Sequence, residues 1–402
     1  MTTYLIIGNG VAGNSAAEAI RTIDREGKIL IFSKDKIPFY YVPALPEYIA
    51  GGKELRYIII HDEKWYEKNR IDLYLTAEIE KVDPSLKTVV TKNGATYIYD
   101  RLLLATGGYS FVPPIKGAQS EGVYTLRTFA DAEVIREKAK QFKRLVLIGG
   151  GLLGLEAGNA LRKLGIEVTV VEFFPRLLPR QMDVTGASLL QKQMEGMGFR
   201  FRLGATTREI IRRNGTLSVF LESGETLDTD MVLVSAGVRP ELTLAKSLGL
   251  EIDKGVRVDD SMKTSIDDIY AAGDLTEHRG RLYGIWPAAM EQGRVAGAAM
   301  AGKDAQYKGT VPANTLKVVG IDLMAVGEID PEGTMESITS KNETKSTYRK
   351  LVLKDNAIIG ALFFGDVHGS EEIQNAIKTK LDITSIKDDL ADEKFDFAGL
   401  RR

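Results

Sequence analysis

The sequence contains no cysteine and only three histidines among its 402 residues. Without a thiol, the chain can form no disulfide, perform no cysteine catalysis, and hold neither a thiolate-bound zinc ion nor an iron–sulfur cluster. His61, His278 and His368 are far apart in the sequence and lack the spacings typical of histidine metal sites. We therefore expect no metal site, and the chain's own side chains supply little redox chemistry.

An excess of positive charge and long apolar segments are also missing. The formal net charge is −2, whereas proteins that bind nucleic acid present a strongly basic face, so nucleic acid is not expected as the main partner. There is no run of about 18 apolar residues that would predict a membrane span. The chain starts directly with a strand-like segment, without a basic region or a cleavage site, which predicts a cytoplasmic protein. The length predicts two or three domains.

Three glycines near the N-terminus, Gly8, Gly10 and Gly13, follow the spacing G-x-G-x-x-G. The surrounding sequence predicts a strand, a helix and a second strand, at residues 3–8, 14–24 and 28–33. In such a unit the first glycine permits a tight turn, the second admits a pyrophosphate, and the third lets the helix pack on the strand. Val11 and Ala12 complete the loop, where the free N–H groups of the helix face the phosphates. A single match is weak evidence, and an ordinary tight turn is the alternative.

Residues 144–172 repeat the whole pattern. The residues of the second loop are Gly149, Gly151, Leu152, Leu153 and Gly154. Glu172 ends the following strand, about 20 residues after the first glycine, where a carboxylate binds the ribose hydroxyls of an adenosine and repels a 2′-phosphate. The second site is therefore predicted to prefer NAD. Arg176 and Arg180 follow and leave NADP as an alternative, and a carboxylate that merely caps the strand is the other alternative.

The first unit departs from this pattern at the end of its second strand. Ser33 stands where the ribose-binding carboxylate is expected, and Lys34 and Asp35 follow it. The hydroxyl of Ser33 or the carboxylate of Asp35 could take over the ribose contact. Two such loops in one chain predict two bound dinucleotides.

Two further motifs, A-T-G at residues 105–107 and the pair Gly273-Asp274, complete an ordered set of four. In this order the motifs resemble the pyridine-nucleotide-disulfide oxidoreductase superfamily of two-dinucleotide flavoproteins. The resemblance implies that the first loop holds the pyrophosphate of FAD and that Asp274 bonds its ribityl chain. It also implies that a helix N-terminus faces the flavin and that the segment around residue 77 touches the adenine. The other FAD contacts that it implies are Ala77, Glu78, Ala105, Thr106, Gly107, Ala288 and Ala289.

The segment 37–52, which by this resemblance packs beside the flavin ring, indicates the branch of the superfamily. Pro43 stands where coenzyme A disulfide reductases and NADH peroxidases carry their redox cysteine, so disulfide and peroxide reduction are excluded. The segment is more similar to that of NADH:rubredoxin reductases and of the flavoprotein portion of assimilatory nitrite reductases, as are residues 314–329. In that branch, electrons leave the flavin one at a time to a small iron protein.

One departure from this branch concerns charge near the flavin. Relatives carry a lysine or arginine in the segment, commonly paired with the glutamate that is Glu156 here, but no basic residue lies between Lys36 and Lys53. Its loss predicts a lower flavin potential. We expect Glu156 to steer the nicotinamide or the N5 region of the flavin, the alternative being a helix-start carboxylate favoured by the helix dipole. Gly237 resembles a residue that lines the NAD cleft.

The predicted fold class is α/β, with two Rossmann-like domains and a smaller α+β C-terminal domain. The FAD-binding domain is expected at residues 1–112 and 241–307, the inserted NAD-binding domain at 113–240, and the C-terminal interface or cap domain at 308–402. In the last domain, Asp355 and Asn356 predict a hairpin turn, and the apolar spacing over 370–381 predicts a helix. The charged residues 388–402 are expected either to dock on a partner or to fray.

These features favour an FAD-dependent oxidoreductase that transfers electrons between NAD(H) and a one-electron iron protein. The iron protein is a rubredoxin- or ferredoxin-like carrier or an iron–sulfur subunit of a larger dehydrogenase complex, and the chain itself could form an oligomer. An NADH oxidase that passes electrons from FAD directly to O2 is the alternative enzyme. A flavin-binding regulatory or structural protein is the alternative without catalysis.

Overall fold

A computed structural model of the chain describes residues 1–311, 313–392 and 395–400. The chain forms two compact units, each with a five-stranded parallel sheet, so the predicted α/β class is confirmed. The first unit comprises Met1–Phe111, Arg127–Glu133 and Val238–Thr310. The second unit comprises Val112–Leu126, Val134–Gly237 and Val311–Arg402.

The parallel sheet of the first unit has the strand order β19-β7-β1-β2-β3. Its strands are β1 (Thr3–Ile7), β2 (Lys28–Phe32), β3 (Ile71–Tyr74), β7 (Arg101–Leu104) and β19 (Ile269–Ala271). In β1, Tyr4 and Ile6 belong to one buried apolar cluster, whereas Leu5 and Ile7 belong to another. Both faces of the sheet are thus covered, which explains the unbroken apolar run in the sequence.

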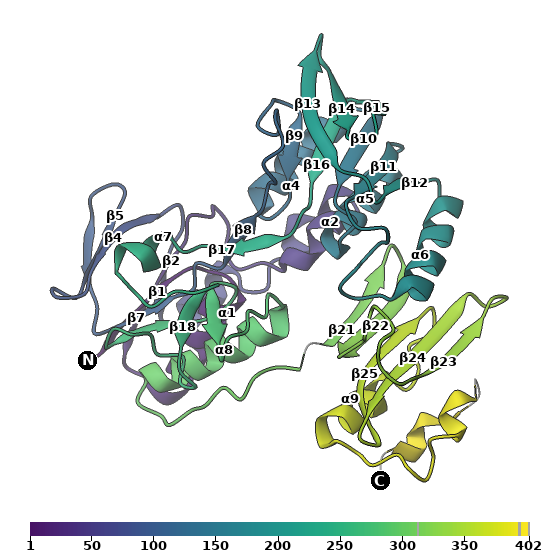
Figure 1. Ribbon diagram of the computed structural model, residues 1–402. Coiled ribbons are helices and arrows are strands. Elements are labelled where there is room, and N and C mark those ends of the chain that lie inside the picture. The colour runs from purple at the N-terminus through teal and green to yellow at the C-terminus, as the bar shows by residue number, and fades with distance from the viewer. Residues whose placement is uncertain (312, 393–394, 401–402) are drawn as a thin grey trace. The chain divides into compact units, whose positions relative to one another are not determined.

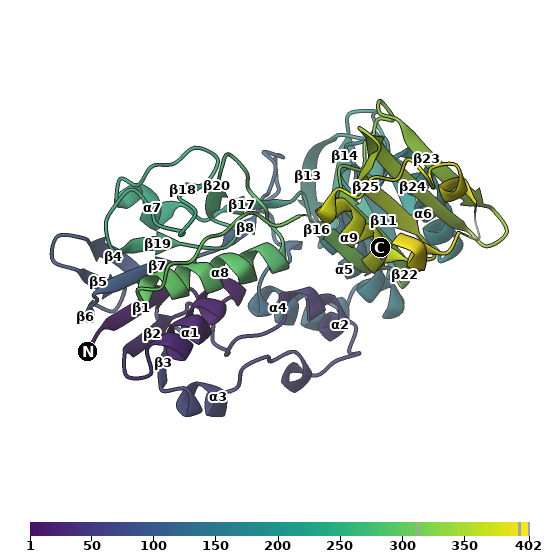
Figure 2. The same ribbon diagram turned by 90° about the horizontal axis from the view of Figure 1, so that it is seen from below.

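Helices α1 (Val11–Ile23) and α8 (Trp286–Met300) lie side by side in the first unit, as Figures 1 and 2 show. Two glycines of α8 permit this close approach. A Cβ atom on Gly293 would lie 2.2 Å from the carbonyl oxygen of Ala12, and one on Gly297 would lie 2.3 Å from that of Ala16. The small residues of both helices therefore determine how closely α8 packs against the helix that follows the first glycine loop.

Smaller elements complete the first unit. Three short sheets are formed by β4 (Ile79–Asp83), β5 (Thr88–Thr91) and β6 (Thr96–Ile98), by β8 (Gly108–Ser110) and β17 (Val238–Pro240), and by β18 (Val256–Val258) and β20 (Thr276–His278). The short helices are η1 (Val42–Ala44), α2 (Leu45–Ile49), η2 (Leu55–Tyr57), α3 (Glu63–Lys68) and α7 (Thr243–Ser247).

The parallel sheet of the second unit has the order β12-β11-β10-β16-β9. Its strands are β9 (Val123–Thr125), β10 (Arg144–Ile148), β11 (Glu167–Glu172), β12 (Arg200–Leu203) and β16 (Met231–Val234). The helices are α5 (Leu152–Lys163) and α6 (Val184–Gly196), with α4 (Phe129–Ala139) starting in the first unit and ending in the second. An antiparallel sheet is added by β13 (Thr207–Arg213), β14 (Thr216–Leu221) and β15 (Thr226–Thr229).

The C-terminal part of the second unit is a five-stranded antiparallel sheet with the order β21-β22-β25-β24-β23. The strands are β21 (Ala313–Val318), β22 (Ile321–Gly327), β23 (Ser337–Asn342), β24 (Thr347–Lys354) and β25 (Ala357–Phe364). The predicted hairpin is confirmed, because Asp355 and Asn356 join β24 to β25 with φ angles of 51° and 57°. The predicted helix is α9 (Ser370–Thr379).

The terminal segment does not fray at the residues that the structure describes. Residues of η3 (Asp389–Ala391) and of η4 (Phe397–Leu400) pack against the C-terminal sheet of the same chain. Leu390, Phe397 and Leu400 are buried in the same apolar cluster as Phe363 of β25. The fraying alternative was therefore wrong for these residues, because their apolar side chains are spaced so that they cover the C-terminal sheet, whereas docking on a partner stays a prediction.

A buried polar cluster joins the C-terminal sheet to the start of α6. The ammonium group of Lys350 donates to the carbonyl oxygen of Asp330 at 2.6 Å, and it lies 3.4 Å and 3.9 Å from the carboxylates of Asp330 and Asp183. Asp183 caps α6 by accepting the N–H of Gly186, and the hydroxyl of Tyr348 donates to it at 2.6 Å. The charges are thus paired within the protein.

No helix in the described part of the chain is both long and apolar enough to cross a membrane.

Candidate functional site

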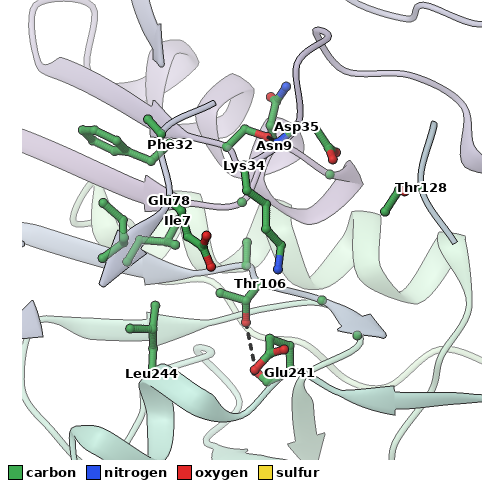
Figure 3. A pocket seen from close by; sticks show the side chains of 18 of the residues that line it. Ile7, Asn9, Phe32, Lys34, Asp35, Glu78, Thr106, Thr128, Glu241 and Leu244 are labelled. Carbon is green, nitrogen blue, oxygen red and sulfur yellow. Dashed lines mark hydrogen bonds between the residues drawn. The ribbon is translucent and has the colours of Figure 1, made fainter. Parts of the chain in front are cut away.

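A cavity of about 480 Å³ lies in the first unit, at the carboxyl ends of β1, β2 and β7. The carboxyl edge of a parallel sheet is where open α/β folds bind ligands. Figure 3 shows its walls, which come from the first glycine loop, the end of β2 and the segments around residues 77, 106 and 241. The sequence-predicted residues that line it are Gly8, Gly10, Ser33, Lys34, Ala77, Glu78, Ala105, Thr106 and Gly107.

The glycine loop at this cavity has the geometry of a phosphate cradle. Gly8 has a φ angle of 122°, and a Cβ atom there would lie 2.0 Å from the carbonyl oxygen of Ala105. A Cβ atom on Gly13 would lie 2.1 Å from the carbonyl oxygen of Gly8, so the loop can turn tightly onto α1. At Gly10, by contrast, no protein atom other than those of its chain neighbours lies within 4 Å of the Cβ position. That space fits a pyrophosphate at the start of α1.

Side chains that the sequence analysis did not single out hold this loop from behind. The amide nitrogen of Asn14 donates to the carbonyl oxygens of Asn9 and Gly10 at 3.1 Å and 3.0 Å. Its amide oxygen accepts from the hydroxyl of Tyr66 at 2.7 Å and lies 3.2 Å from Nδ1 of His61. Burial raises the pKa of Tyr66, so its hydroxyl stays protonated and donates. The loop is thereby fixed without a ligand.

Charged groups from the end of β2 reach the cavity. The side chain of Lys34 extends into it on the side of Thr106, as Figure 3 shows. Burial raises the pKa of Asp35, although the nearby charge of Lys34 opposes the change. The hydroxyl of Thr106 donates to the carbonyl oxygen of Glu241 at 3.0 Å, which joins the A-T-G segment to the opposite wall.

The predicted contact Asp274 does not itself line the cavity but is joined to a residue that does. The guanidinium of Arg127 lies 2.7 Å from its carboxylate and donates through Nε to the carbonyl oxygen of Gly108 at 3.1 Å. Arg127 lines the cavity, and the sequence analysis missed it. Arg127 lies between β9 and α4, outside every motif, so nothing in the sequence except its positive charge indicated a role in the site.

The other residues predicted for the first site lie around the cavity rather than on its wall. The Cβ position of Gly273 is 3.1 Å from Cβ of Ala12 and 3.9 Å from Cβ of Ala289, so the structure brings these three together. Ala288 is buried beside Ala289 in the first turn of α8. Pro43 is exposed in η1, next to Val42, which does line the cavity. The loop residues Val11 and Gly13 belong to α1.

The second glycine loop repeats the same geometry in the second unit. Gly149 has a φ angle of 112°, and a Cβ atom there would lie 2.2 Å from the carbonyl oxygen of Ser235. A Cβ atom on Gly154 would lie 3.0 Å from the carbonyl oxygen of Gly149, whereas no protein atom lies within 4 Å of the Cβ position of Gly151. Leu152 and Leu153 begin α5, and Gly237 is exposed after β16 with a φ angle of 102°.

Glu172 is buried at the end of β11 and faces the second loop. Its carboxylate accepts the N–H of Gly150 and, at 2.8 Å, the N–H of Phe174. The chain that follows also returns to this loop, because the N–H of Leu178 donates to the carbonyl oxygen of Gly150 at 3.1 Å. Residues 172–178 therefore form one wall of the loop. We refer to this segment as the ribose loop.

Glu156 extends from the second turn of α5 to the C-terminal sheet. Its carboxylate accepts the N–H of Val319, in the turn between β21 and β22, at 2.6 Å. The C-terminal sheet thus supplies a backbone donor to the glutamate of the second loop motif. A carboxylate held in this way has a defined position beside the glycine loop.

Comparisons with known proteins agree with this geometry. The sequence profile of the pyridine nucleotide-disulphide oxidoreductase family matches residues 2–293, and that of the rubredoxin NAD+ reductase C-terminal domain matches residues 312–381. The NAD(P)H nitrite reductase of Bacillus subtilis is 36% identical over 94% of this chain and 48% of its own length. The NADH-rubredoxin oxidoreductase of Clostridium acetobutylicum is 32% identical over 96% of this chain and 97% of its own length.

Among solved structures, a ferredoxin reductase from Rhodopseudomonas palustris matches with a TM-score of 0.90 and 26% identity, over 99% of both chains. The chain spans about half the length of the nitrite reductase, whereas it spans nearly all of the rubredoxin oxidoreductase.

Proposed function

Because the chain belongs to the pyridine nucleotide-disulphide oxidoreductase family, we propose that it passes electrons between NAD(H) and a one-electron iron protein. The observation that carries this choice is the match to an NADH-rubredoxin oxidoreductase over almost the full length of both chains. The electron partner is a rubredoxin- or ferredoxin-like carrier, or an iron–sulfur subunit of a larger dehydrogenase for which this chain is the NAD-facing module.

As a member of this family the chain is an oxidoreductase that uses FAD and a pyridine nucleotide. The first cavity fits FAD, because the loop from Gly8 to Gly13 leaves room for a pyrophosphate at Gly10. Lys34 brings a positive charge to the wall of this cavity, where it would favour a bound diphosphate, whereas the charge of Arg127 is paired with Asp274. FAD supplies the ability to accept a hydride and to release electrons singly, which no side chain of this protein has.

The second loop is proposed to hold NAD. Its phosphates would face the N–H groups at the start of α5, with the open position at Gly151 beside them. Glu172 would accept the ribose hydroxyls while it remains bonded to the loop. We assign Glu156 the role of positioning the nicotinamide end, with the N–H of Val319 fixing its carboxylate, and we place Gly237 at the edge of the same site.

The absence of a thiol indicates which kind of electron acceptor this chain can use. The sequence has no cysteine, and Pro43 occupies the position that a redox cysteine takes in disulfide reductases. This chain therefore offers no sulfur relay between flavin and acceptor. Transfer to an iron protein needs no such relay, because it requires only that the two redox groups approach each other.

The remaining assignments belong to the same proposal. We assign the FAD-binding domain to residues 1–112 and 241–307, the NAD-binding domain to 113–240, and the C-terminal domain to 308–402. The three five-stranded sheets support three domains, although the first unit also includes Arg127–Glu133 and the second unit joins the NAD-binding and C-terminal domains. We place the protein in the cytoplasm, where NADH and small iron carriers are available.

The proposal is tested with the full chain, purified and loaded with FAD. Under anaerobic conditions NADH is expected to bleach the flavin absorbance, and the bleaching is followed in a stopped-flow instrument. A rubredoxin and a plant-type ferredoxin are then added separately, and their reduction is followed. Reoxidation by at least one carrier is expected to be faster than reoxidation by air-saturated buffer.

Three outcomes would contradict the proposal in different ways. A chain that binds no FAD overturns the assignment of the first dinucleotide site and the proposed electron transfer. Flavin that is bound but not bleached by NADH indicates the non-catalytic alternative. Reoxidation that is rapid with O2 and no faster with any carrier indicates the NADH oxidase.

A further inference from the structure

An arginine of the ribose loop forms an ion pair with a glutamate of the C-terminal part of the chain. Arg176 lies in this loop between Glu172 and Leu178, the two residues that bond Gly150. Only 12% of its side chain is exposed. Its guanidinium donates to Glu332, in the segment between β22 and β23, at 2.5 Å. Arg176, the cation nearest in sequence to Glu172, is therefore paired with a glutamate 156 positions later in the chain.

The guanidinium also keeps an unused donor. Besides the bond to Glu332, its Nη2 atom lies 3.4 Å from the carbonyl oxygen of Pro179. Its Nε atom is buried and has no hydrogen-bond partner in the structure. Buried donors without a partner are uncommon and point to an unfilled acceptor position. A phosphate on the ribose of a bound nucleotide is an acceptor of the right charge for an arginine.

We propose that Glu332 determines nucleotide specificity: by holding Arg176, it prevents this arginine from binding the 2′-phosphate of NADP. The proposal rests on the NAD site proposed above and deepens it. Glu172 repels a 2′-phosphate directly, and Glu332 removes the one buried cation of the ribose loop that could compensate. The C-terminal sheet thereby takes part in choosing the nucleotide, although it supplies none of the glycine-loop residues.

The charge balance makes the effect selective. NAD carries two neutral hydroxyl groups at the ribose, so the charge of Arg176 has little influence on its binding. NADP carries a phosphate there, so release of Arg176 from Glu332 adds a favourable charge pair. Replacement of Glu332 should therefore raise the affinity for NADP and leave the affinity for NAD nearly constant. Glu332 is 67% exposed, so the substitution leaves no cavity.

The test uses the full chain and the variant Glu332→Gln. Binding of adenosine 2′,5′-bisphosphate and of AMP, which represent the adenosine halves of NADP and NAD, is measured by titration calorimetry. Glu332→Gln is expected to bind the bisphosphate about fivefold more tightly, equivalent to about 1 kcal/mol, with AMP affinity unchanged. In turnover with ferricyanide, the ratio of kcat/KM for NADH to that for NADPH is expected to fall by a similar factor.

Two further variants separate specificity from a structural role. Glu336→Gln is the matched control, because Glu336 is an exposed glutamate of the same region that pairs with Lys387 at 2.7 Å, and it should change neither affinity. The double variant Arg176→Gln/Glu332→Gln should lose the gain in bisphosphate affinity.

The inference is overturned if Glu332→Gln leaves both the affinity ratio and the kinetic ratio unchanged, or if the gain persists without Arg176. The binding measurement requires no turnover. A chain that binds AMP but does not oxidise NADH would contradict the proposed function and still test this inference.

Discussion

Gly8 combines two conditions that only glycine meets. Its φ angle of 122° is a backbone conformation that residues with a side chain rarely adopt, and its Cβ position is 2.0 Å from the carbonyl oxygen of Ala105. The same contact joins the first loop to the A-T-G segment, which supplies another wall of the cavity. A change at this one residue therefore affects two walls of the proposed FAD site.

Gly8→Ala is expected to yield protein without bound flavin and to destabilise the first unit by about 1 to 3 kcal/mol. The ratio of flavin to protein absorbance after purification, together with urea unfolding, measures both effects. Gly196→Ala is the control, because apart from its own helix backbone and chain neighbours no protein atom lies within 4 Å of the Cβ position of Gly196. A Gly8→Ala protein that retains a full complement of FAD would show that the loop does not hold the cofactor.

Part of the first cavity could be predicted from the sequence, because glycine spacing constrains the backbone directly. Nine predicted residues lie on its wall: the first glycine loop and the A-T-G motif gave five of them, and the end of the second strand and the resemblance around residue 77 gave four. Arg127 was missed because its partners Asp274 and Gly108 are remote in the sequence and no local pattern connects them. Asn14 was read only as part of a helix, although its amide bonds the loop itself.

At the scale of elements, the packing of α1 against α8 depends on backbone contact rather than on large side chains. Gly293 lies at this contact with its Cβ position 2.2 Å from the carbonyl oxygen of Ala12. Ala12 belongs to the helix that starts at the proposed pyrophosphate site. A larger side chain at this contact is therefore expected to displace the start of α1.

Gly293→Ala is expected to lower the free energy of unfolding by about 1 to 3 kcal/mol, because one methyl group must be inserted between two closely packed helices. FAD affinity should fall as well. Thermal unfolding and flavin titration measure the two effects. Arg294→Ala, on the exposed side of the same helix, should change stability by less than about 0.5 kcal/mol. Equal stability of the two variants would contradict the close packing.

The predicted strands and helices around both glycine loops agree with the structure to within a few residues. The first strand was expected at residues 3–8 and is Thr3–Ile7, and the helix expected at 14–24 is Val11–Ile23. The helix starts earlier because the loop residues after Gly10 already have helical conformation. The C-terminal sheet was foreseen only as one hairpin, since the pairing of β21 and β22 with β25 depends on contacts distant in the sequence.

At the scale of the whole molecule, the buried cluster around Lys350 makes the second unit sensitive to acid. Burial alone would raise the pKa of Asp330. Hydrogen bonds from the backbone of Met335 and Thr334 and from the Thr334 hydroxyl, with the charge of Lys350, lower it instead to about 2. In the unfolded chain the pKa of an aspartate is about 4. The group therefore contributes stability above about pH 4 that is lost as the pH falls through about 2.

The stability of the second unit is expected to fall between about pH 4 and about pH 2, and Asp330→Asn should remove part of this dependence. Urea unfolding at several pH values, followed by a probe in the C-terminal sheet, measures it. Thr334→Val removes only the hydroxyl bond to Asp330 and gives a smaller change in a protein that still folds. Asp388→Asn, at an exposed aspartate, should keep the full dependence. An Asp330→Asn protein with the same acid profile would exclude this explanation.

The division of the chain into two units has a consequence for building hybrids with related reductases. The chain passes from one unit to the other five times, at Phe111/Val112, Leu126/Arg127, Glu133/Val134, Gly237/Val238 and Thr310/Val311. A hybrid gene with a single crossover point would therefore combine segments of both proteins within each unit. A graft of the second unit must leave the heptapeptide Arg127–Glu133 with the first unit, because this heptapeptide carries the guanidinium that pairs with Asp274.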